Sequence, residues 1–503
     1  MQTVLSWLEN AAAEQPEKIA LVDENNSCTY AEWLKQARAM AAVLPAELNR
    51  EPIGVMCDRS YHPLIAFMAV AFSGNFYVPL EASTPAARLA VIAQNSGMRI
   101  LLGYAVEAPC TLPEGVQYLS LQALPTATPA QLAHVMDVRK SIQGDDPLYM
   151  VYTSGSTGVP KGVIKSHRSV KGFVQAYCKV FDFRQEDVWG NQSPFYFDAF
   201  AKDLYTVLAT TASMHILSKK LFSFPIELVK YLNEANITVI SWVPSALAIM
   251  AQLRVFDVDV PRSLRYVLFV GEVFAPKYFN IWRRALPKTV FANTYGFSEV
   301  AGVCLYAQLD EEQPETQPLP LGRPFPGTQV MVLDENRCPV QPGETGELCV
   351  RSDSLALGYY NDPERTAKVF IQNPLVYAWP ERVYRSGDLV YCGDDGNLRF
   401  VGRADLQIKH MGHRIELQEI EAAALRCEEL SSVCCVYDEK RSRIVLAYVS
   451  RSGADIGRAE LNAVMSKHLP DYMLPHRLVR LEQMPLNANG KIDRPALRGQ
   501  LIR

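Results

Sequence analysis

The sequence predicts an α/β protein with a large N-terminal domain of α/β sheets, a β-rich subdomain and a small α+β C-terminal domain. Three observations carry this prediction. Apolar runs alternate with amphipathic runs up to about Thr328, short strands punctuated by turns follow, and a compact mixture of both begins after Arg403. The length of 503 residues agrees, because it exceeds what one hydrophobic core usually supports.

The first region contains the βα pattern of a parallel or mixed sheet. Its apolar, β-rich runs predict strands at 52–56, 148–152, 237–242 and 265–270. Amphipathic runs between them predict helices at 226–235 and 245–253.

The later regions are read from turn residues and periodicity. Turn signals at 334–336, 342–344 and 394–397 mark the β-rich subdomain. Beyond it, the pattern predicts helices at 416–427 and 458–468, with a hairpin of strands 433–437 and 444–449 between them. We therefore expect two domains, 1–403 and 404–503.

Composition excludes several classes of protein. Hydrophobic residues make up 49% and charged residues 21%, an ordinary balance for a globular protein, and the net charge of −4 gives no reason to expect nucleic-acid binding. The eleven cysteines are scattered without a CxxC pair, which is typical of a reduced protein. No apolar run has the roughly 18 residues of a membrane span, so a cytoplasmic enzyme is expected.

The run YTSGSTGVPKG at 152–162 directly follows an apolar strand and has the chemistry of a phosphate-binding loop. Its glycines allow close backbone approach, its hydroxyls donate hydrogen bonds and its lysine supplies a point charge. The spacing differs from the GxxxxGK[ST] loop of P-loop proteins. A mobile Ser/Gly linker is the alternative, but linkers rarely place a lysine between two apolar strands.

This run resembles the signature of the adenylate-forming superfamily, which comprises acyl-CoA synthetases, luciferases and the adenylation domains of nonribosomal peptide synthesis. Further matching motifs follow in order along nearly the whole chain: TYAEWLKQA from 29, GNFYVPLEASTPAAR from 74, FDAFAKDLY from 197, NTYGFSE from 293, GELCVRSDSLALGYYNDPERT from 346, YRSGDLV from 384, GRADLQIKHMGHRIELQEIE from 402, LPDYMLP from 469 and NGKIDR from 489. GNFYVPLE and QIKHMGHRIEL are most similar to the amino-acid-activating branch, and the length is similar to that of stand-alone D-alanine:carrier protein ligases.

The resemblance implies that the protein activates an amino acid as aminoacyl-AMP, using ATP and Mg²⁺ and releasing pyrophosphate. The aminoacyl group would then pass to the phosphopantetheine thiol of a carrier protein. Only 12 residues follow Lys491, so the carrier is expected in trans. An acyl- or aryl-CoA ligase is the second hypothesis. A nucleotide-binding protein that no longer catalyses is the third, and the presence of Lys161, Glu299, Asp388 and Lys491 argues against it.

The resemblance also assigns roles at the ATP site. Lys491 is the expected catalytic lysine, because charge builds up on the α-phosphate during attack by the carboxylate. Glu299 is expected to hold Mg²⁺, which prefers carboxylate oxygen. The expected ATP-binding residues are Thr153, Ser154, Gly155, Ser156, Thr157, Gly158, Lys161, Asn293, Tyr295, Gly296, Ser298, Asp388 and Arg403. Tyr295 would stack on adenine and Asp388 would bind the ribose; Phe297 departs from the family's proline.

The small C-terminal domain of this family is mobile, and Asp405 is the expected hinge. Hinges are a few residues that absorb a large φ/ψ change. The loop 410–416 would then line the path of the incoming thiol, with Gly412 allowing close backbone approach. His413 is expected to be structural, since attack by a thiol does not demand a general base.

Asp198 lies where amino-acid-activating members bind the α-ammonium group of the substrate. Lys202 is open to two interpretations: an i, i+4 ion pair with Asp198, or a cation for a substrate carboxylate. The second interpretation favours an acidic amino acid, and D-alanine or another small amino acid is the alternative. The expected substrate-binding residues are Asp198, Ala199, Lys202, Ser241, Leu268, Val270, Gly271, Thr294, Gly302 and Val303.

Overall fold

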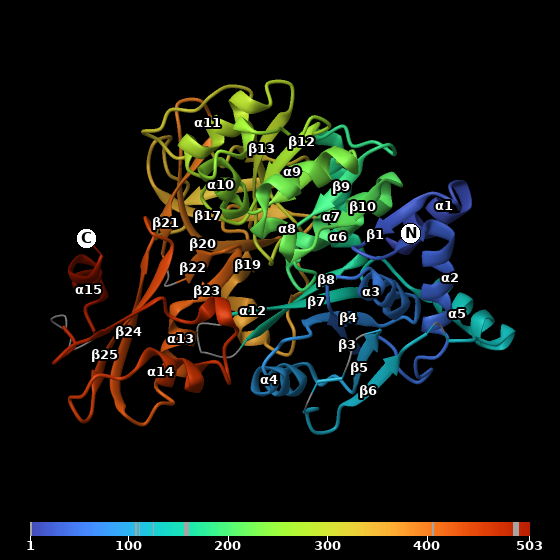
Figure 1. Cartoon of the computed structure of the whole chain (residues 1–503), viewed down its shortest axis with the longest axis horizontal. Coiled ribbons are helices and arrows are strands. Elements are labelled where there is room, and N and C mark those ends of the chain that lie inside the picture. Colours follow the sequence, from blue (N-terminus) through green and yellow to red (C-terminus); the bar gives the residue numbers. More distant parts are fainter. Residues whose placement is uncertain are drawn as a thin grey trace.

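Two large mixed sheets organise the N-terminal part of the protein in the computed structural model, which describes residues 3–105, 108–109, 111–123, 125–154, 160–404, 407–485 and 492–502 (Figure 1). The first sheet has the order β15-β14-β13-β12-β11-β9-β10-β1-β2. Its strands are β1 Ile19–Val22, β2 Ser27–Thr29, β9 Val188–Asn191, β10 Ser213–Ile216, β11 Val239–Trp242, β12 Tyr266–Phe269, β13 Val290–Tyr295, β14 Leu305–Gln308 and β15 Arg323–Pro324.

The second sheet has the order β18-β8-β7-β4-β3-β5-β6. Its strands are β3 Pro52–Cys57, β4 Phe76–Glu81, β5 Ile100–Tyr104, β6 Gln117–Leu121, β7 Pro147–Thr153, β8 Lys161–Ser166 and β18 Gly358–Tyr359. Strands β7 and β8 pair antiparallel on either side of the predicted phosphate loop, so Thr153 lies opposite Lys161.

Helices connect and cover the two sheets. They are α1 Leu5–Glu14, α2 Tyr30–Ala41, α3 His62–Phe72, α4 Ala86–Ser96, α5 Pro129–Ser141, α6 His167–Val180, α7 Asp198–Thr210, α8 Lys219–Ser223, α9 Pro225–Glu234, α10 Pro244–Gln252, α11 Pro276–Ala285 and the short 3₁₀ helix Val255–Asp257. Helix α2 begins with a capping box that Thr29 and Glu32 form, which satisfies two backbone N–H groups.

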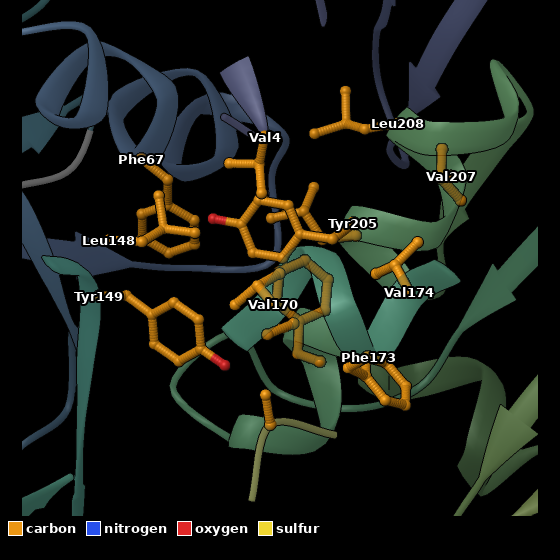
Figure 2. Close-up of a cluster of buried hydrophobic side chains, with 14 of the residues drawn as sticks. Val4, Phe67, Leu148, Tyr149, Val170, Phe173, Val174, Tyr205, Val207 and Leu208 are labelled. Atoms are coloured by element: carbon orange, nitrogen blue, oxygen red, sulfur yellow. The ribbon is translucent and has the colours of Figure 1, made fainter. Parts of the chain in front are cut away.

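The main hydrophobic core lies between the two sheets and is filled by α3, α6 and α7. Helix α3 is buried along its whole length, since its sequence is apolar on every side. Figure 2 shows Tyr149 of β7 and Tyr205 of α7 in this core, with Phe67 of α3 and Phe173 of α6 nearby. Helix α7 therefore begins at the boundary between the core and the cleft described below.

The β-rich subdomain and the C-terminal domain follow as predicted, and the fold class is confirmed. The subdomain contains β16 Thr328–Leu333, β17 Gly346–Ser352, α12 Pro363–Val369, β19 Phe370–Gln372, β20 Arg382–Cys392 and β21 Leu398–Arg403. The C-terminal elements are β22 Gln407–His410, β23 His413–Glu416, α13 Leu417–Ala424, β24 Leu430–Asp438, β25 Arg443–Ser450, α14 Arg458–Met465, the short 3₁₀ helix Asp471–Met473, β26 Arg477–Arg480 and α15 Arg494–Leu501. In Figure 1 this domain lies at the lower left, and its own core packs α13 and α14 against the β24-β25 hairpin.

Candidate active site

A cleft of about 150 Å³ lies between the N-terminal domain and the hairpin β22-β23. It forms where the parallel strands β11, β12 and β13 end, the edge at which ligands bind in open α/β sheets. Twelve of the predicted site residues line it: Thr153, Ser154, Asp198, Ala199, Lys202, Val270, Gly271, Gly296, Ser298, Gly302, Val303 and Arg403. Sequence motifs more than 200 residues apart thus meet at one place.

Three predicted pocket walls do not line the cleft. Leu268 lies within β12, two residues before the cleft residue Val270, and is fully buried in the core. Thr294 is buried and donates a hydrogen bond to the carbonyl of Phe269 at 3.0 Å. Ser241 contacts the cleft residue Lys202 rather than the cleft itself. Motif position does not specify depth along a strand, so the role of these three residues in substrate binding stays a prediction.

Asp198 begins α7 and is fully neutralised by residues of the second sheet. Its Oδ1 accepts a hydrogen bond from the Tyr149 hydroxyl at 2.8 Å, and its Oδ2 lies 3.4 Å from Lys165 Nζ. Burial raises the pKa of Asp198 and lowers that of Lys165, and their attraction partly offsets both shifts. Lys165 is completely buried, so it is the partner of Asp198 within the chain.

Lys202 also has a partner within the chain. Its Nζ lies 2.5 Å from Asp203 Oδ1 and donates to Ser241 Oγ at 2.5 Å. The interpretation of Lys202 and Asp198 as an i, i+4 pair is therefore wrong. Burial raises the pKa of Asp203, and Lys202 opposes that shift. A buried cation needs a counter-charge, and Asp203 supplies it before any substrate binds.

Glu299 lies at the centre of a second buried cluster. Its Oε1 accepts hydrogen bonds from Lys161 Nζ at 3.1 Å and from the Tyr359 hydroxyl at 2.7 Å, and its Oε2 accepts from Arg414 Nη1 at 2.7 Å. Burial would raise the Glu299 pKa, but Arg414 and Lys161 more than offset it, so the pKa lies far below its ordinary value. Arg414 belongs to the C-terminal domain, so this carboxylate joins the two domains.

The expected Mg²⁺ ligand does not fit a metal ion in this arrangement. Both Glu299 oxygens already face cations, which a divalent cation would have to displace. Within the described residues no group of three His, Cys, Asp or Glu side chains is placed to hold a metal. We therefore derive no step of the reaction from a metal ion.

Asp388, the expected ribose ligand, is buried and bonded at both oxygens. Arg403 donates to Oδ1 and the Tyr295 hydroxyl donates to Oδ2. The ammonium of Lys409 lies 4.8 Å from the centre of the Tyr295 ring, a cation–π contact. Neither Tyr295 nor Asp388 lines the cleft here, whereas Arg403 does. Asn293 also turns away from it and donates to the carbonyl of Pro320.

The phosphate loop is described only at its edges. Thr153 Oγ1 is buried and has no hydrogen-bond partner among the described residues, which fits a site for a phosphate oxygen. Ser154 Oγ instead donates to the main-chain carbonyl of Arg414 at 2.6 Å and accepts from the amide of Glu416 at 3.2 Å. Gly155, Ser156, Thr157 and Gly158 lie outside the described residues, as do the expected hinge Asp405 and the expected catalytic residue Lys491.

The turn of the hairpin β22-β23 packs directly against the N-terminal domain. Gly412 has φ +80°, and a Cβ there would come within 2.7 Å of Val243 Cγ1, so the turn has no room for a side chain at this position; its place on the path of the thiol stays a prediction. Its amide donates to Glu272 Oε1 at 2.7 Å. His413 stacks on Tyr472 at 3.3 Å between ring centres, and burial lowers its pKa to about 3. A neutral, packed imidazole agrees with the predicted structural role.

A wider cavity of about 690 Å³ adjoins the cleft and shares Tyr196, Phe197 and His413 with it. Three cations line it among the described residues, and all are engaged. Arg59 donates to the carbonyls of Ser193 and Leu217, among others; Arg88 pairs with Glu419 at 2.7 Å; and Lys219 pairs with Glu81 at 3.3 Å.

A membrane-spanning helix is not found in the part of the chain that the structure describes, because no helix there is both long and apolar enough.

The chain belongs to the family of AMP-binding enzymes. The model described as "AMP-binding enzyme" matches residues 8–360, and that described as "AMP-binding enzyme C-terminal domain" matches residues 419–491. Among curated proteins, tyrocidine synthase 1 of Brevibacillus parabrevis is 31% identical over 500 residues, which cover 99% of this chain and 45% of the relative. The chain thus spans less than half the length of the first curated relatives that it matches.

Solved structures share the fold. IdnL1 superposes with a TM-score of 0.79 at 27% identity, covering 96% of this chain and 98% of its own. Holo-PA1221, an NRPS protein containing adenylation and PCP domains, superposes with a TM-score of 0.84 at 24% identity, covering 99% of this chain and 84% of its own. The resemblance inferred from the motifs is therefore confirmed at the level of the family and the fold.

Sequence reasoning missed four charged or polar residues at the site. Lys165 and Asp203 neutralise the cleft residues Asp198 and Lys202, while Arg414 and Tyr359 bind Glu299. One signal was present for Lys165, because a charge in the run KGVIKS interrupts an otherwise apolar strand that follows the phosphate loop. For the other three residues only the folded arrangement shows which groups meet.

Proposed function

We propose that this protein activates a small amino acid with ATP, forming an aminoacyl adenylate and pyrophosphate, and then transfers the aminoacyl group to a thiol. The observation that carries the proposal is the convergence of Asp198, Thr153 and the 296–303 segment on one small cleft at the strand ends. Asp198 would orient the amine of the substrate. The buried hydroxyl of Thr153, which has no partner within the described residues, would contact a phosphate of the nucleotide.

Membership of the AMP-binding family supports an adenine nucleotide as the second substrate. ATP, when bound, supplies the adenylyl group: the carboxylate of the amino acid would bond to the α-phosphorus, and pyrophosphate would leave. The chain itself provides cations close to the cleft, namely Arg403 and Lys409 in its lining. Cations fixed in a buried site stabilise the negative charge that develops during such a displacement. We also propose that residues 404–503 form the mobile domain, with Asp405 as its hinge.

The Lys202–Asp203 pair argues for an uncharged side chain. The hypothesis of an acidic substrate rested on Lys202 as a cation without a partner, and that premise fails because Asp203 lies 2.5 Å away. A carboxylate side chain in the cleft would add a negative charge to a pair that is already neutral. A small, uncharged amino acid such as D-alanine has no side-chain charge that needs a partner there.

Pyrophosphate exchange across a panel of D- and L-amino acids tests the proposal. We expect ATP–pyrophosphate exchange with small, uncharged amino acids and little with glutamate or aspartate. Exchange that is strongest with glutamate or aspartate would contradict the inference drawn from Lys202. Absence of exchange with every carboxylic acid in the panel would contradict the proposed reaction.

The thiol acceptor is proposed to be the phosphopantetheine arm of a carrier protein. Coenzyme A carries phosphates at the far end of the same arm, and these need free cations at the mouth of the access path. The cations that line the wider cavity, within the described residues, are already bonded to protein groups. We therefore expect faster thioester formation with a carrier protein that bears a free phosphopantetheine thiol than with free CoA, measured by mass spectrometry. Equal or faster turnover with CoA would favour the alternative of a CoA ligase.

A further inference from the structure

Lys165 does not line the cleft but contacts the cleft residue Asp198, and neither the proposed reaction nor the fold explains its charge. It lies on β8 with its side chain completely buried, and the hydrogen-bond partner that the structure gives its ammonium is Asp198 Oδ2 at 3.4 Å. Placing a lysine in an otherwise apolar core is costly unless it neutralises another buried charge. The consequence of Lys165 for the charge of Asp198 is therefore the question.

The pair changes what the cleft requires of a substrate. An isolated carboxylate in a buried cleft demands a cation, and an α-ammonium group satisfies that demand. Here the Lys165–Asp198 pair has zero net charge whether the proton is on Lys165 or on Asp198. The carboxylate therefore has a counter-charge before the substrate binds. An entering ammonium would share one carboxylate with Lys165 and leave the buried cluster with an excess positive charge.

An uncharged α-substituent avoids this excess. An α-hydroxyl donates one hydrogen bond to the carboxylate and brings no charge, so the ion pair remains intact. The Asp198 oxygens have free acceptor capacity, because each oxygen carries two lone pairs and the structure gives each one partner. The geometry thus admits a hydroxyl at the place where an ammonium is expected.

We propose that Lys165 is a specificity-determining residue that relaxes the requirement for an α-ammonium group, so that small 2-hydroxy acids are activated as well as small amino acids. The proposal rests on the proposed function, because it concerns the acid that this site adenylates. Lys165 acts through Asp198 and is a positioning residue.

The first test uses the unmodified protein and matched pairs of probes in ATP–pyrophosphate exchange. The pairs are glycine with glycolate, alanine with lactate, serine with glycerate and valine with 2-hydroxyisovalerate, each chiral acid as both enantiomers. We expect the kcat/KM of the best hydroxy acid to lie within about tenfold of that of its amino acid, since one shared hydrogen bond separates them. A preference for the amino acid greater than that contradicts the proposal.

The second test replaces Lys165 by methionine, which is similar in volume and uncharged. Two groups that bond to the same carboxylate lie within roughly 6 Å of each other, where a like charge shifts equilibria by tenfold or more. Lys165→Met is therefore expected to raise the ratio of kcat/KM for the amino acid over that for the hydroxy acid by about tenfold or more. An unchanged or lower ratio overturns the proposal.

Tyr149→Phe is the matched control. It removes the other hydrogen bond to Asp198 without removing a charge, so the same ratio is expected to change by less than about threefold. If Lys165→Met does not fold, the comparison of paired acids in the unmodified protein decides. Exchange with amino acids alone contradicts this inference and leaves the proposed function standing, whereas absence of exchange with every acid contradicts the proposed function and removes the inference with it.

Discussion

Replacing Glu299 by glutamine is expected to destabilise the protein by about 3–5 kcal/mol, the usual cost of removing one partner from a buried ion pair. Lys161 and Arg414 both depend on this carboxylate, and the amide that replaces it carries no charge. Thermal and urea unfolding of the variant beside the unmodified protein measure the loss. An unchanged melting temperature would show that the two cations find other partners.

Asp137→Asn is the control for that experiment. Asp137 pairs with Lys140 at 2.9 Å on the exposed face of α5. Exposed pairs contribute little, because water screens them and holding two long side chains in place costs entropy. The melting temperature of this variant is expected to match that of the unmodified protein within error.

The contribution of Glu299 should also depend on pH. Its pKa in the folded protein lies below the ordinary value of 4.5, so the folded state binds the proton less readily than the unfolded state. The stability from Glu299 is therefore complete above about pH 5 and is lost as the pH falls further. The difference in stability between the unmodified protein and Glu299→Gln is expected to shrink below pH 4.5. A difference in stability that grows as the pH falls would contradict a lowered pKa of Glu299 in the folded protein.

Lys491→Ala is expected to lower the rate of adenylation by roughly 10²-fold or more while ATP still binds, as loss of a charge-stabilising group typically does. The prediction rests on the position of Lys491 in NGKIDR, the last of the ordered motifs. Pyrophosphate exchange measures the rate of adenylation, and equilibrium binding of a nonhydrolysable ATP analogue measures the affinity for the nucleotide. Exchange close to normal would remove Lys491 from the catalytic role.

Lys140→Ala is the control for the substitution of Lys491. Lys140 lies on the exposed face of α5, and its ammonium contacts Asp137 there. Losing it removes a charge of the same kind without touching the cleft. Exchange with this variant is expected to equal that of the unmodified protein.

The strands and helices that the sequence analysis places were predictable because each has its own local signal. The apolar run predicted at 237–242 became β11, and the amphipathic run predicted at 226–235 became α9, each shifted at its ends by two residues or fewer. Periodicity and turn residues are local signals that extend over a few residues, so they do not depend on tertiary contacts. Which strands pair in each of the two sheets depends on tertiary contacts, so local signals could not predict it.

The candidate site was predictable only as far as motifs specify it. Leu268 lies in β12 and Val270 just beyond its end, and both are buried, but only the folded structure shows that Val270 lines the cleft and Leu268 does not. The partners of Asp198 and Lys202 came from another sheet and from the adjacent residue in the chain. A charge is visible in a sequence, whereas the group that neutralises it depends on tertiary contacts.

The contact of Ser154 with the hairpin has a consequence for the order of events. A hydroxyl carries a single proton, and Ser154 gives its own to the carbonyl of Arg414. The same hydroxyl cannot donate to a phosphate oxygen at the same time. A nucleotide that accepts this hydrogen bond can therefore do so only after the contact between Ser154 and the Arg414 carbonyl is broken, so nucleotide binding and this contact with the hairpin exclude each other.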